Sequence, residues 1–132
     1  MNSGLQKTTA VVTGGASGIG AACVREFANK GTRVAIIDVD RELGEQLAEE
    51  VHGRFYSADV TREGDIAQAA AKIDTDLGSV DVLVTSAGIG QNLMPPETLS
   101  MKDWDRVVDT NFRGTYVTCA VFGARMALQG CG

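Results

Sequence analysis

The sequence predicts an α/β fold in which helices cover both faces of a doubly wound parallel sheet. Short apolar stretches alternate four times with stretches whose apolar residues recur at helical spacing. The apolar stretches are nearly continuous, as expected for parallel strands that are buried on both faces. The chain has 132 residues, the size of one domain, and no repeat or linker divides it. We therefore expect a single α/β domain over residues 1–132.

The elements follow one another in a regular order. The strands are expected at residues 9–13, 33–38, 54–58 and 80–85. The helices are expected at residues 19–30, 41–52, 66–77 and 102–128. Gly31 and Gly53 stand where the first two helices are expected to end. In this connectivity the strands take the order 3-2-1-4, which leaves the apolar fourth strand at an edge of the sheet.

Composition and charge exclude several classes of function. The formal net charge is −5 and no Lys/Arg cluster is present, so a nucleic-acid partner is not expected. No apolar run approaches the ~20 residues of a membrane span, and the N-terminal stretch MNSGLQKTT lacks the apolar core of a signal peptide. The three scattered cysteines indicate neither a disulfide framework nor a metal site. We expect a cytoplasmic protein that binds neither membrane nor metal.

The stretch TGGASGIG, residues 13–20, joins the first strand to the first helix. Gly14, Gly18 and Gly20 follow the spacing G-x-x-x-G-x-G, which differs from the G-x-G-x-x-G dinucleotide pattern. Glycines let the backbone turn sharply and approach a pyrophosphate, toward which the helix directs its unpaired amides and its dipole. Ser17 adds a hydroxyl donor. The alternative is a tight turn that only packs the helix against the strand.

Asp38 ends the second strand, eighteen positions after Gly20. In dinucleotide-binding α/β units an acid at about this place accepts hydrogen bonds from the adenosine ribose hydroxyls. A carboxylate would repel the 2′-phosphate of NADP, so NAD is the expected cofactor, while the nearby Arg41 keeps NADP as the less favoured alternative. Asp38 can also be read as the N-cap of the next helix, and the two roles are compatible.

Together these motifs resemble those of the short-chain dehydrogenase/reductase family, whose members have an NAD(P)-binding Rossmann fold. Residues 13–20 match the family's TGxxxGIG motif at every fixed position. Further markers follow in order: ADV at residues 58–60, TSAG at 85–88 where the family usually has NNAG, and VDTNFRGTY with Asn111. The resemblance covers essentially the whole chain. It implies hydride transfer between NAD(H) and a small-molecule alcohol or ketone.

The resemblance also implies a set of site residues. Asn111 would be catalytic, because the family's helix asparagine anchors a water in a proton relay. Asp59 would hold the adenine edge, and the Ala87–Gly88 peptide would pass close to the nicotinamide-side ribose. The expected cofactor-binding residues are Gly14, Ser17, Gly18, Ile19, Gly20, Asp38, Asp59, Val60, Ser86, Ala87 and Gly88. Because the family's long helix often lies in a dimer interface, a homo-oligomer is expected.

The helical pattern gives Asn111 independent interest. Trp104, Val107, Val108 and Asn111 recur at i, i+3, i+4 and i+7, which predicts a core-facing position for Asn111. A polar amide there must find hydrogen-bond partners or lower stability. The alternative to a catalytic role is an amide satisfied by neighbouring backbone.

Part of the family's chemistry has no counterpart in these residues. The family acts through a Ser and a YxxxK pair. The two tyrosines of this chain, Tyr56 and Tyr116, are followed four positions later by Val60 and Ala120. We therefore expect an incomplete domain, cut after the fourth strand and its following long helix, and an isolated chain of low stability.

Two other functions are kept as alternatives. The first is a non-catalytic NAD-binding fragment, because Ser and YxxxK are absent from the chain. The second is a flavodoxin-like signalling domain in which Asp38 or Asp59 accepts a phosphoryl group. Such receivers do not need TGGASGIG, so the sequence favours the dinucleotide-binding hypotheses.

Overall fold

The computed structural model describes residues 4–91 and 93–132. Residues 1–3, part of the N-terminal stretch that lacks a signal-peptide core, lie outside the described residues. The parallel strands of the sheet are β1 (Thr9–Thr13), β2 (Arg33–Asp38), β3 (Arg54–Ser57) and β4 (Val82–Thr85). Their order is β3-β2-β1-β4, so the predicted strand order is confirmed.

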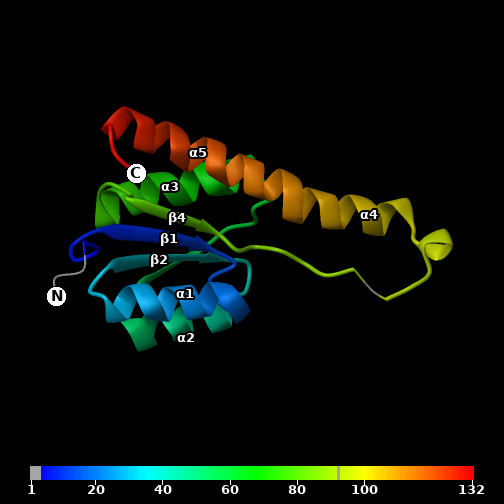
Figure 1. Ribbon diagram of the computed structural model, residues 1–132, viewed down its shortest axis with the longest axis horizontal. Helices are drawn as coiled ribbons and strands as arrows, with labels where there is room; N and C mark the ends of the chain where they lie inside the picture. The colour runs from blue at the N-terminus through cyan, green and yellow to red at the C-terminus, as the bar shows by residue number, and fades with distance from the viewer. Residues whose placement is uncertain (1–3, 92) are drawn as a thin grey trace.

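Helices cover both faces of this sheet, as Figure 1 shows. The α-helices are α1 (Gly18–Asn29), α2 (Arg41–Val51), α3 (Glu63–Leu77), α4 (Met101–Val108) and α5 (Gly114–Gln129). The α1 and α2 helices pack on one face, while α3 and α5 lie against the other. A short 3₁₀ helix, η1 (Pro96–Thr98), lies in the loop after β4. The predicted α/β, Rossmann-like architecture is therefore confirmed.

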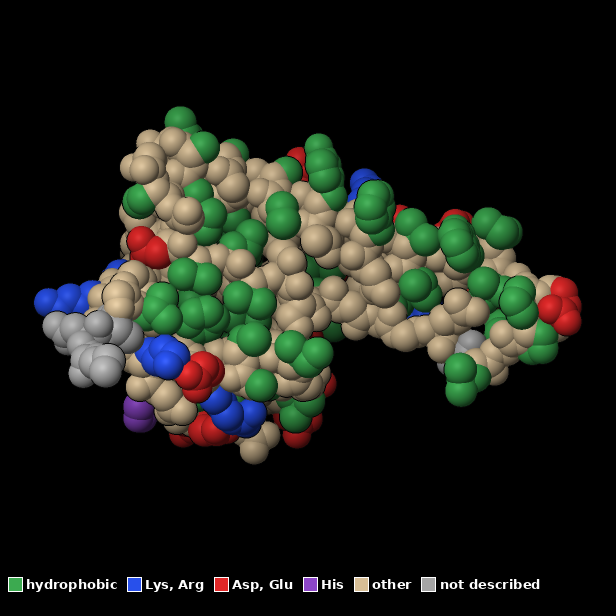
Figure 2. All heavy atoms as spheres, in the orientation of Figure 1, with side chains coloured by type: hydrophobic (Ala, Val, Ile, Leu, Met, Phe, Trp, Pro, Cys, Tyr) green, Lys and Arg blue, Asp and Glu red, His purple; other side chains and the backbone are tan. Residues whose placement is uncertain are grey.

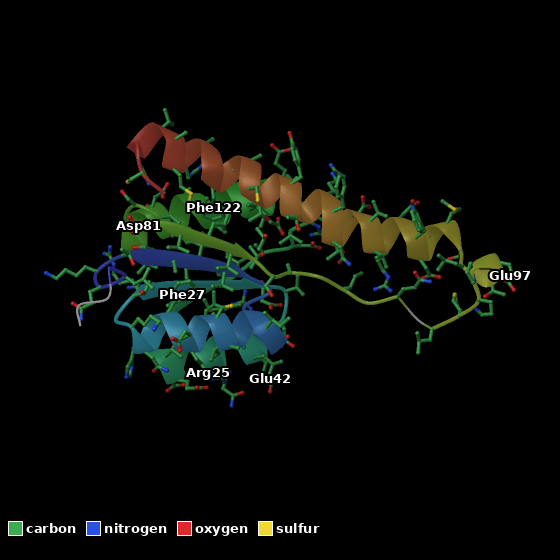
Figure 3. All side chains as sticks on the ribbon, in the orientation of Figure 1. Arg25, Phe27, Glu42, Asp81, Glu97 and Phe122 are labelled. Carbon is green, nitrogen blue, oxygen red and sulfur yellow. The ribbon has the colours of Figure 1, made fainter. Side chains whose placement is uncertain are left out.

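The two faces of the sheet carry separate cores. Val12, Ile36 and Leu47 belong to the core under α1 and α2. Val11 and Phe122 belong to the core under α3 and α5, and Figure 3 shows Phe122 on α5 directed toward the sheet. Because neighbouring residues of β1 alternate between the two cores, every residue of this strand is buried.

The capping residues at both ends of α2 differ from the sequence-based expectations. Its N-cap is Asp40, whose side chain accepts a hydrogen bond from the Leu43 amide at 3.0 Å. The alternative role of Asp38 as this cap is therefore wrong. After α2 the left-handed residue is His52, with φ of 54°, rather than Gly53.

The long C-terminal helix is interrupted by one π-helical turn, η2 (Asp109–Arg113), which joins α4 to α5. The α4 end of this helix extends beyond the sheet, together with the loop that leads to it (Figure 1). Trp104 is 51% exposed and Asn111 is exposed as well, so the predicted core-facing stripe is wrong. The physical reason is that no sheet lies beneath α4, and the wider π turn shifts the helical phase.

Candidate functional site

A cavity of about 1030 Å³ lies at the carboxyl ends of β1, β2 and β4, beneath the overhanging α4. In open α/β sheets this edge is the usual place for a ligand. Ten of the eleven expected cofactor-binding residues line the cavity: Gly14, Ser17, Gly18, Ile19, Asp38, Asp59, Val60, Ser86, Ala87 and Gly88. Gly20 and Asn111 are not among its lining residues.

The glycine-rich turn between β1 and α1 is packed so tightly that Gly14 and Gly20, among others, leave no room for a side chain. Gly14 has φ of +62°, and a Cβ there would lie 2.6 Å from the backbone of Ala87. A Cβ on Gly20 would lie 2.1 Å from the carbonyl oxygen of Gly14. Gly20 therefore supports the turn from beneath, and the turn reaches the end of β4 because neither residue has a side chain.

The α1 helix begins at the cavity wall. Its N-cap, Ser17, makes no side-chain capping hydrogen bond and is exposed. Gly18 also has a positive φ, +55°, and a Cβ there would meet no atom within 4 Å. The amides of the first helical turn have no intrahelical partners, and the helix dipole makes this end electropositive. The arrangement therefore presents backbone donors and a hydroxyl to an anion.

Asp38 stands at the end of β2, where its carboxylate contacts two backbone amides. Its Oδ2 accepts from the Ala16 amide at 3.0 Å, and its Oδ1 accepts from the Asp40 amide at 3.0 Å. The side chain is partly exposed and lines the cavity. A carboxylate offers about four acceptor positions, so two such contacts leave room for ligand hydroxyls.

Asp59 and Val60 follow β3 at the next corner of the cavity. Asp59 Oδ1 accepts from the Thr61 amide at 2.9 Å and from the Thr61 hydroxyl at 2.7 Å, which fixes the carboxylate. Val60 is buried and packs on α5: a Cβ on Gly114 would lie 2.6 Å from Val60 Cγ2. These contacts give the pocket one polar and one apolar wall at this corner.

The TSAG segment keeps its backbone close to the glycine-rich turn although it departs from NNAG. The Ser86 amide donates to the Thr13 carbonyl at 3.1 Å, and the Ala87 amide donates to the Thr13 hydroxyl at 3.4 Å. Thr85 lies opposite Thr13 in the sheet. Contacts with Thr13 of β1 therefore hold this segment, and Ser86 lines the cavity.

Asn111 lies in the π turn and binds the loop after β4. Its Oδ1 accepts from the Ile89 amide at 2.8 Å, and its Nδ2 donates to the Ile89 carbonyl at 2.9 Å. Both polar atoms of the Asn111 side chain thus bind the backbone of one residue, Ile89, as the alternative to a catalytic role predicted. Ile89 itself lines the cavity, so Asn111 acts on the site through the loop.

Several cavity residues were missed by sequence reasoning. They come chiefly from α4 and the π turn: Lys102, Asp103, Asp105, Arg106, Asp109 and Thr110. The helical pattern of this segment gave no sign that its polar side would face the sheet edge. The overhang of α4 brings these residues to the cavity, and it depends on the loop that follows β4 (Figure 1).

Tyr56 lies away from the cavity and is unsuited to proton transfer. Its hydroxyl donates to Asp76 Oδ2 at 3.0 Å. Burial, and then the hydrogen bond to the Asp76 carboxylate, raise the pKa of the Tyr56 hydroxyl far above its ordinary value. The tyrosine therefore stays protonated and serves the packing of β3 against α3.

Two classes of site have no support in the described part of the chain. Within residues 4–91 and 93–132, no three or more His, Cys, Asp or Glu side chains gather so as to hold a metal ion. No helix in the same residues has the length and apolarity to span a membrane.

Comparison with known proteins gives a family match over nearly the whole chain. The family model described as short chain dehydrogenase matches residues 8–132. The D-threitol dehydrogenase of Mycolicibacterium smegmatis is 39% identical over 133 residues, which is 97% of this chain and 51% of that protein. The 3-beta-hydroxysteroid dehydrogenase of Comamonas testosteroni is 37% identical over 123 residues, 90% of this chain and 47% of that protein.

A solved structure agrees with these relatives. The 3-ketoacyl-(acyl-carrier-protein) reductase of Brucella melitensis, complexed with NADH, superposes with a TM-score of 0.92 at 31% identity. The match covers 96% of this chain and 52% of that one. The chain thus spans about half the length of the curated relatives and of this structural neighbour.

Proposed function

This chain belongs to the short chain dehydrogenase family, and on that premise we propose that it binds NAD for an oxidoreductase. The reaction would be hydride transfer between NAD(H) and a small-molecule alcohol or ketone. The observation that carries the proposal is the meeting of three elements at one cavity: the glycine-rich turn, the Asp38 carboxylate and the end of β4. Residues 1–132 would form the cofactor-binding part of one domain.

The cavity walls fit a dinucleotide. The cavity volume, about 1030 Å³, suits a large cofactor, since ligand pockets range from roughly 300 to 1,000 Å³. At Gly14 and Gly18 the turn has no side chain, so a pyrophosphate can approach the backbone there. The amides of the first α1 turn and the Ser17 hydroxyl would donate to the phosphate oxygens.

Asp38 and Arg41 support NAD rather than NADP. The Asp38 carboxylate lies at the cavity and would accept from the ribose hydroxyls, and its negative charge would repel a 2′-phosphate. Arg41 is the cation nearest along the chain, but its Nη1 pairs with Glu45 at 2.9 Å. Its guanidinium also lies 6.0 Å from the centre of the Phe55 ring and does not line the cavity. Of Asp38 and Arg41, only Asp38 therefore lines the cavity.

The chain's residues would orient the cofactor and the loop above it. Bound NAD supplies the hydride acceptor, and the protein places it. Asp59 would accept from the adenine edge, and the backbone of Ala87 and Gly88 would lie along the second ribose. Asn111, through its two bonds to Ile89, would hold the loop after β4 and keep the π turn in place for a relay water. The acid–base residues would belong to the part of the relatives' length that this chain does not cover.

The relatives' names support an alcohol substrate. A D-threitol dehydrogenase and a 3-beta-hydroxysteroid dehydrogenase both match the chain at more than 35% identity, by 39% and 37%. These names cover molecules of very different size, so the proposal stops at the class of alcohols and ketones. We place the reaction in the cytoplasm.

A homo-oligomer is proposed through the outer face of α4 and α5. Figure 2 shows hydrophobic side chains along this ridge. Trp104, Phe112 and Tyr116 are 51%, 76% and 72% exposed. Large exposed aromatic side chains favour burial against a second copy. Sedimentation at several protein concentrations tests this, because a concentration-independent monomer would contradict it.

The experiment that tests the function combines binding with turnover. Calorimetric titration of the purified protein with NAD and NADP should give NAD binding and at least about tenfold weaker NADP binding. Absorbance of the reduced cofactor then reports oxidation of a panel of polyols and secondary alcohols. Binding without turnover on any alcohol or ketone would favour the non-catalytic NAD-binding alternative, and absence of NAD binding would contradict both hypotheses.

A further inference from the structure

Asp38 makes two contacts that a ribose acceptor does not need. Its Oδ2 accepts from the Ala16 amide at 3.0 Å, and its Oδ1 accepts from the Asp40 amide at 3.0 Å. Ala16 is only 8% exposed and lies in the middle of the glycine-rich turn. The same carboxylate therefore joins the end of β2 to the turn that precedes α1.

A second hydrogen bond also joins this turn to β2. The Gly15 amide donates to the Ile37 carbonyl at 3.3 Å, which is the neighbouring link between the turn and β2. On either side, Gly14 and Gly18 have left-handed φ values of +62° and +55°. A chain segment of this kind has no regular helix or strand bonds of its own. Its shape, and with it the direction of the first α1 amides, depends on these links to β2.

We propose that Asp38 is a positioning residue for the anion-binding turn as well as an acceptor for the ribose. This inference rests on the proposed NAD function. A carboxylate has about four acceptor positions, so the amides of Ala16 and Asp40 and the ribose hydroxyls use different lone pairs of one group. Replacement of Asp38 then weakens the pyrophosphate site even for a ligand that has no ribose hydroxyls.

Two ligands and two variants separate the roles. ADP carries both ribose hydroxyls, and 2′,3′-dideoxy-ADP carries neither. Asp38→Ala and Asp38→Asn remove the same charge, so both relieve the same repulsion of the phosphates. The asparagine keeps one oxygen acceptor. Because Ala16 is buried and Asp40 is exposed, that oxygen is expected to face the Ala16 amide, while water serves the Asp40 amide.

Calorimetric titration of the purified protein and both variants gives the result. We expect D38A to bind 2′,3′-dideoxy-ADP about tenfold more weakly than D38N, the effect of losing a hydrogen bond to a buried amide. Equal affinities of the two variants for this ligand would overturn the positioning role. If the wild-type protein binds neither ligand, the proposed function itself fails. If it binds both and the variants are equal, only this inference fails.

Amide hydrogen exchange supplies a readout that needs no ligand. The Ala16 amide should exchange slowly in the wild-type protein and in D38N, and faster in D38A, while the Gly15 amide changes less. Unchanged Ala16 exchange in D38A would also overturn the inference. Should D38A prove too unstable to purify, Asp38→Val gives a side chain without an acceptor that suits the end of a strand, and the same comparison with D38N applies.

Discussion

The β1 and β4 strands are neighbours of similar sequence, but they have different surroundings. The residues of β1, TAVVT, are all buried. The residues of β4, VLVT, are all only half-buried. They are paired in register, with Val12 opposite Val84. Among the described residues β1 has a strand on each side, whereas β4 is paired with β1 alone.

The difference shows that the apolar pattern of a strand predicts its type but not its burial. Burial depends on what covers the strand. β4 is paired with β1 on one edge, α5 contacts one of its faces, and Val84 packs against the core under α1 and α2. Figure 2 shows hydrophobic side chains over the sheet between the helix layers. β1 therefore lies within a complete core below the glycine-rich turn, whereas β4 leaves part of its apolar surface exposed.

The largest effect of a substitution is expected in the glycine-rich turn that follows β1. In Gly20→Ala the new Cβ would lie 2.1 Å from the Gly14 carbonyl oxygen, so backbone has to move. We expect a loss of about 3 kcal/mol in the free energy of unfolding together with loss of NAD binding. Urea denaturation and calorimetry measure the two effects.

A matched glycine serves as the control for that variant. Gly64 lies in α3 and a Cβ there would meet no atom within 4 Å. Gly64→Ala should leave NAD binding unchanged and leave stability equal or raised by up to about 1 kcal/mol, because alanine is the better helix former. Equal losses in both variants would show that the turn is not specially constrained.

The next effect compares the paired strand residues directly. Val12→Ala removes two methyl groups from a position that is 0% exposed and should lower stability by about 2 kcal/mol. Val84→Ala, at its half-buried partner, should lower stability by about 1 kcal/mol. Urea denaturation of both variants under the same conditions gives the ratio. Equal losses would mean that β4 is covered as fully as β1 in solution.

A smaller effect concerns β3, at the other edge of the sheet. Tyr56→Phe removes the hydrogen bond to Asp76, so we expect a loss of about 1 kcal/mol at pH 7. The pKa of Tyr56 is raised by burial, so the tyrosine's contribution is complete below the unfolded pKa of about 10 and is lost as the pH rises further. The variant should therefore lose less stability than the wild type above about pH 10.

Urea midpoints measured from neutral to strongly alkaline pH check this sign. Tyr116→Phe is the control for loss of a tyrosine hydroxyl, because the Tyr116 side chain is 72% exposed and the substitution should leave the neutral stability unchanged. A wild-type protein and Y56F with parallel pH profiles would disprove the link between burial of Tyr56 and alkaline stability.

The smallest effect is expected at an exposed ion pair between two helices. Arg25 of α1, labelled in Figure 3, lies 2.7 Å from Glu50 of α2. The hydrogen bond from Arg25 holds the pKa of Glu50 below its ordinary value. The contribution of this ion pair to stability is present at neutral pH and is lost as the pH falls through the lowered pKa of Glu50. Glu50→Gln should shift the melting temperature only slightly, and added salt should remove the difference. A large, salt-independent shift relative to Glu49→Gln would contradict this.

The sequence predicted the sheet well because its signals are local. Each strand is an apolar stretch that ends at glycine or a polar residue, and the TGGASGIG stretch predicts a sharp turn between a strand and a helix. Asp38, predicted to bind the ribose, lies at the cavity, whereas its capping role was wrong because the Asp40 side chain accepts from the Leu43 amide. Whether these residues bind a cofactor stays a prediction.

The features that the sequence did not predict, the course of α4 and the exposure of Asn111, depend on long-range geometry. The pattern of Trp104 and Asn111 assumed a regular helix over a core, but the helix leaves the sheet and contains a π turn. No local signal distinguishes a helix that packs from one that overhangs. For the same reason Lys102 and Arg106 were not assigned to the cavity, although both line it.

The most direct test of the account is an NMR titration of the labelled protein with NAD, followed through backbone amide shifts. We predict that the large shifts fall on residues 14–20, on Asp38 and Val39, on 59–61 and on 86–89, with little change at β3 or in α3. Shifts centred on the β3 edge, or none at saturating NAD, would contradict the claim that this cavity is a dinucleotide site.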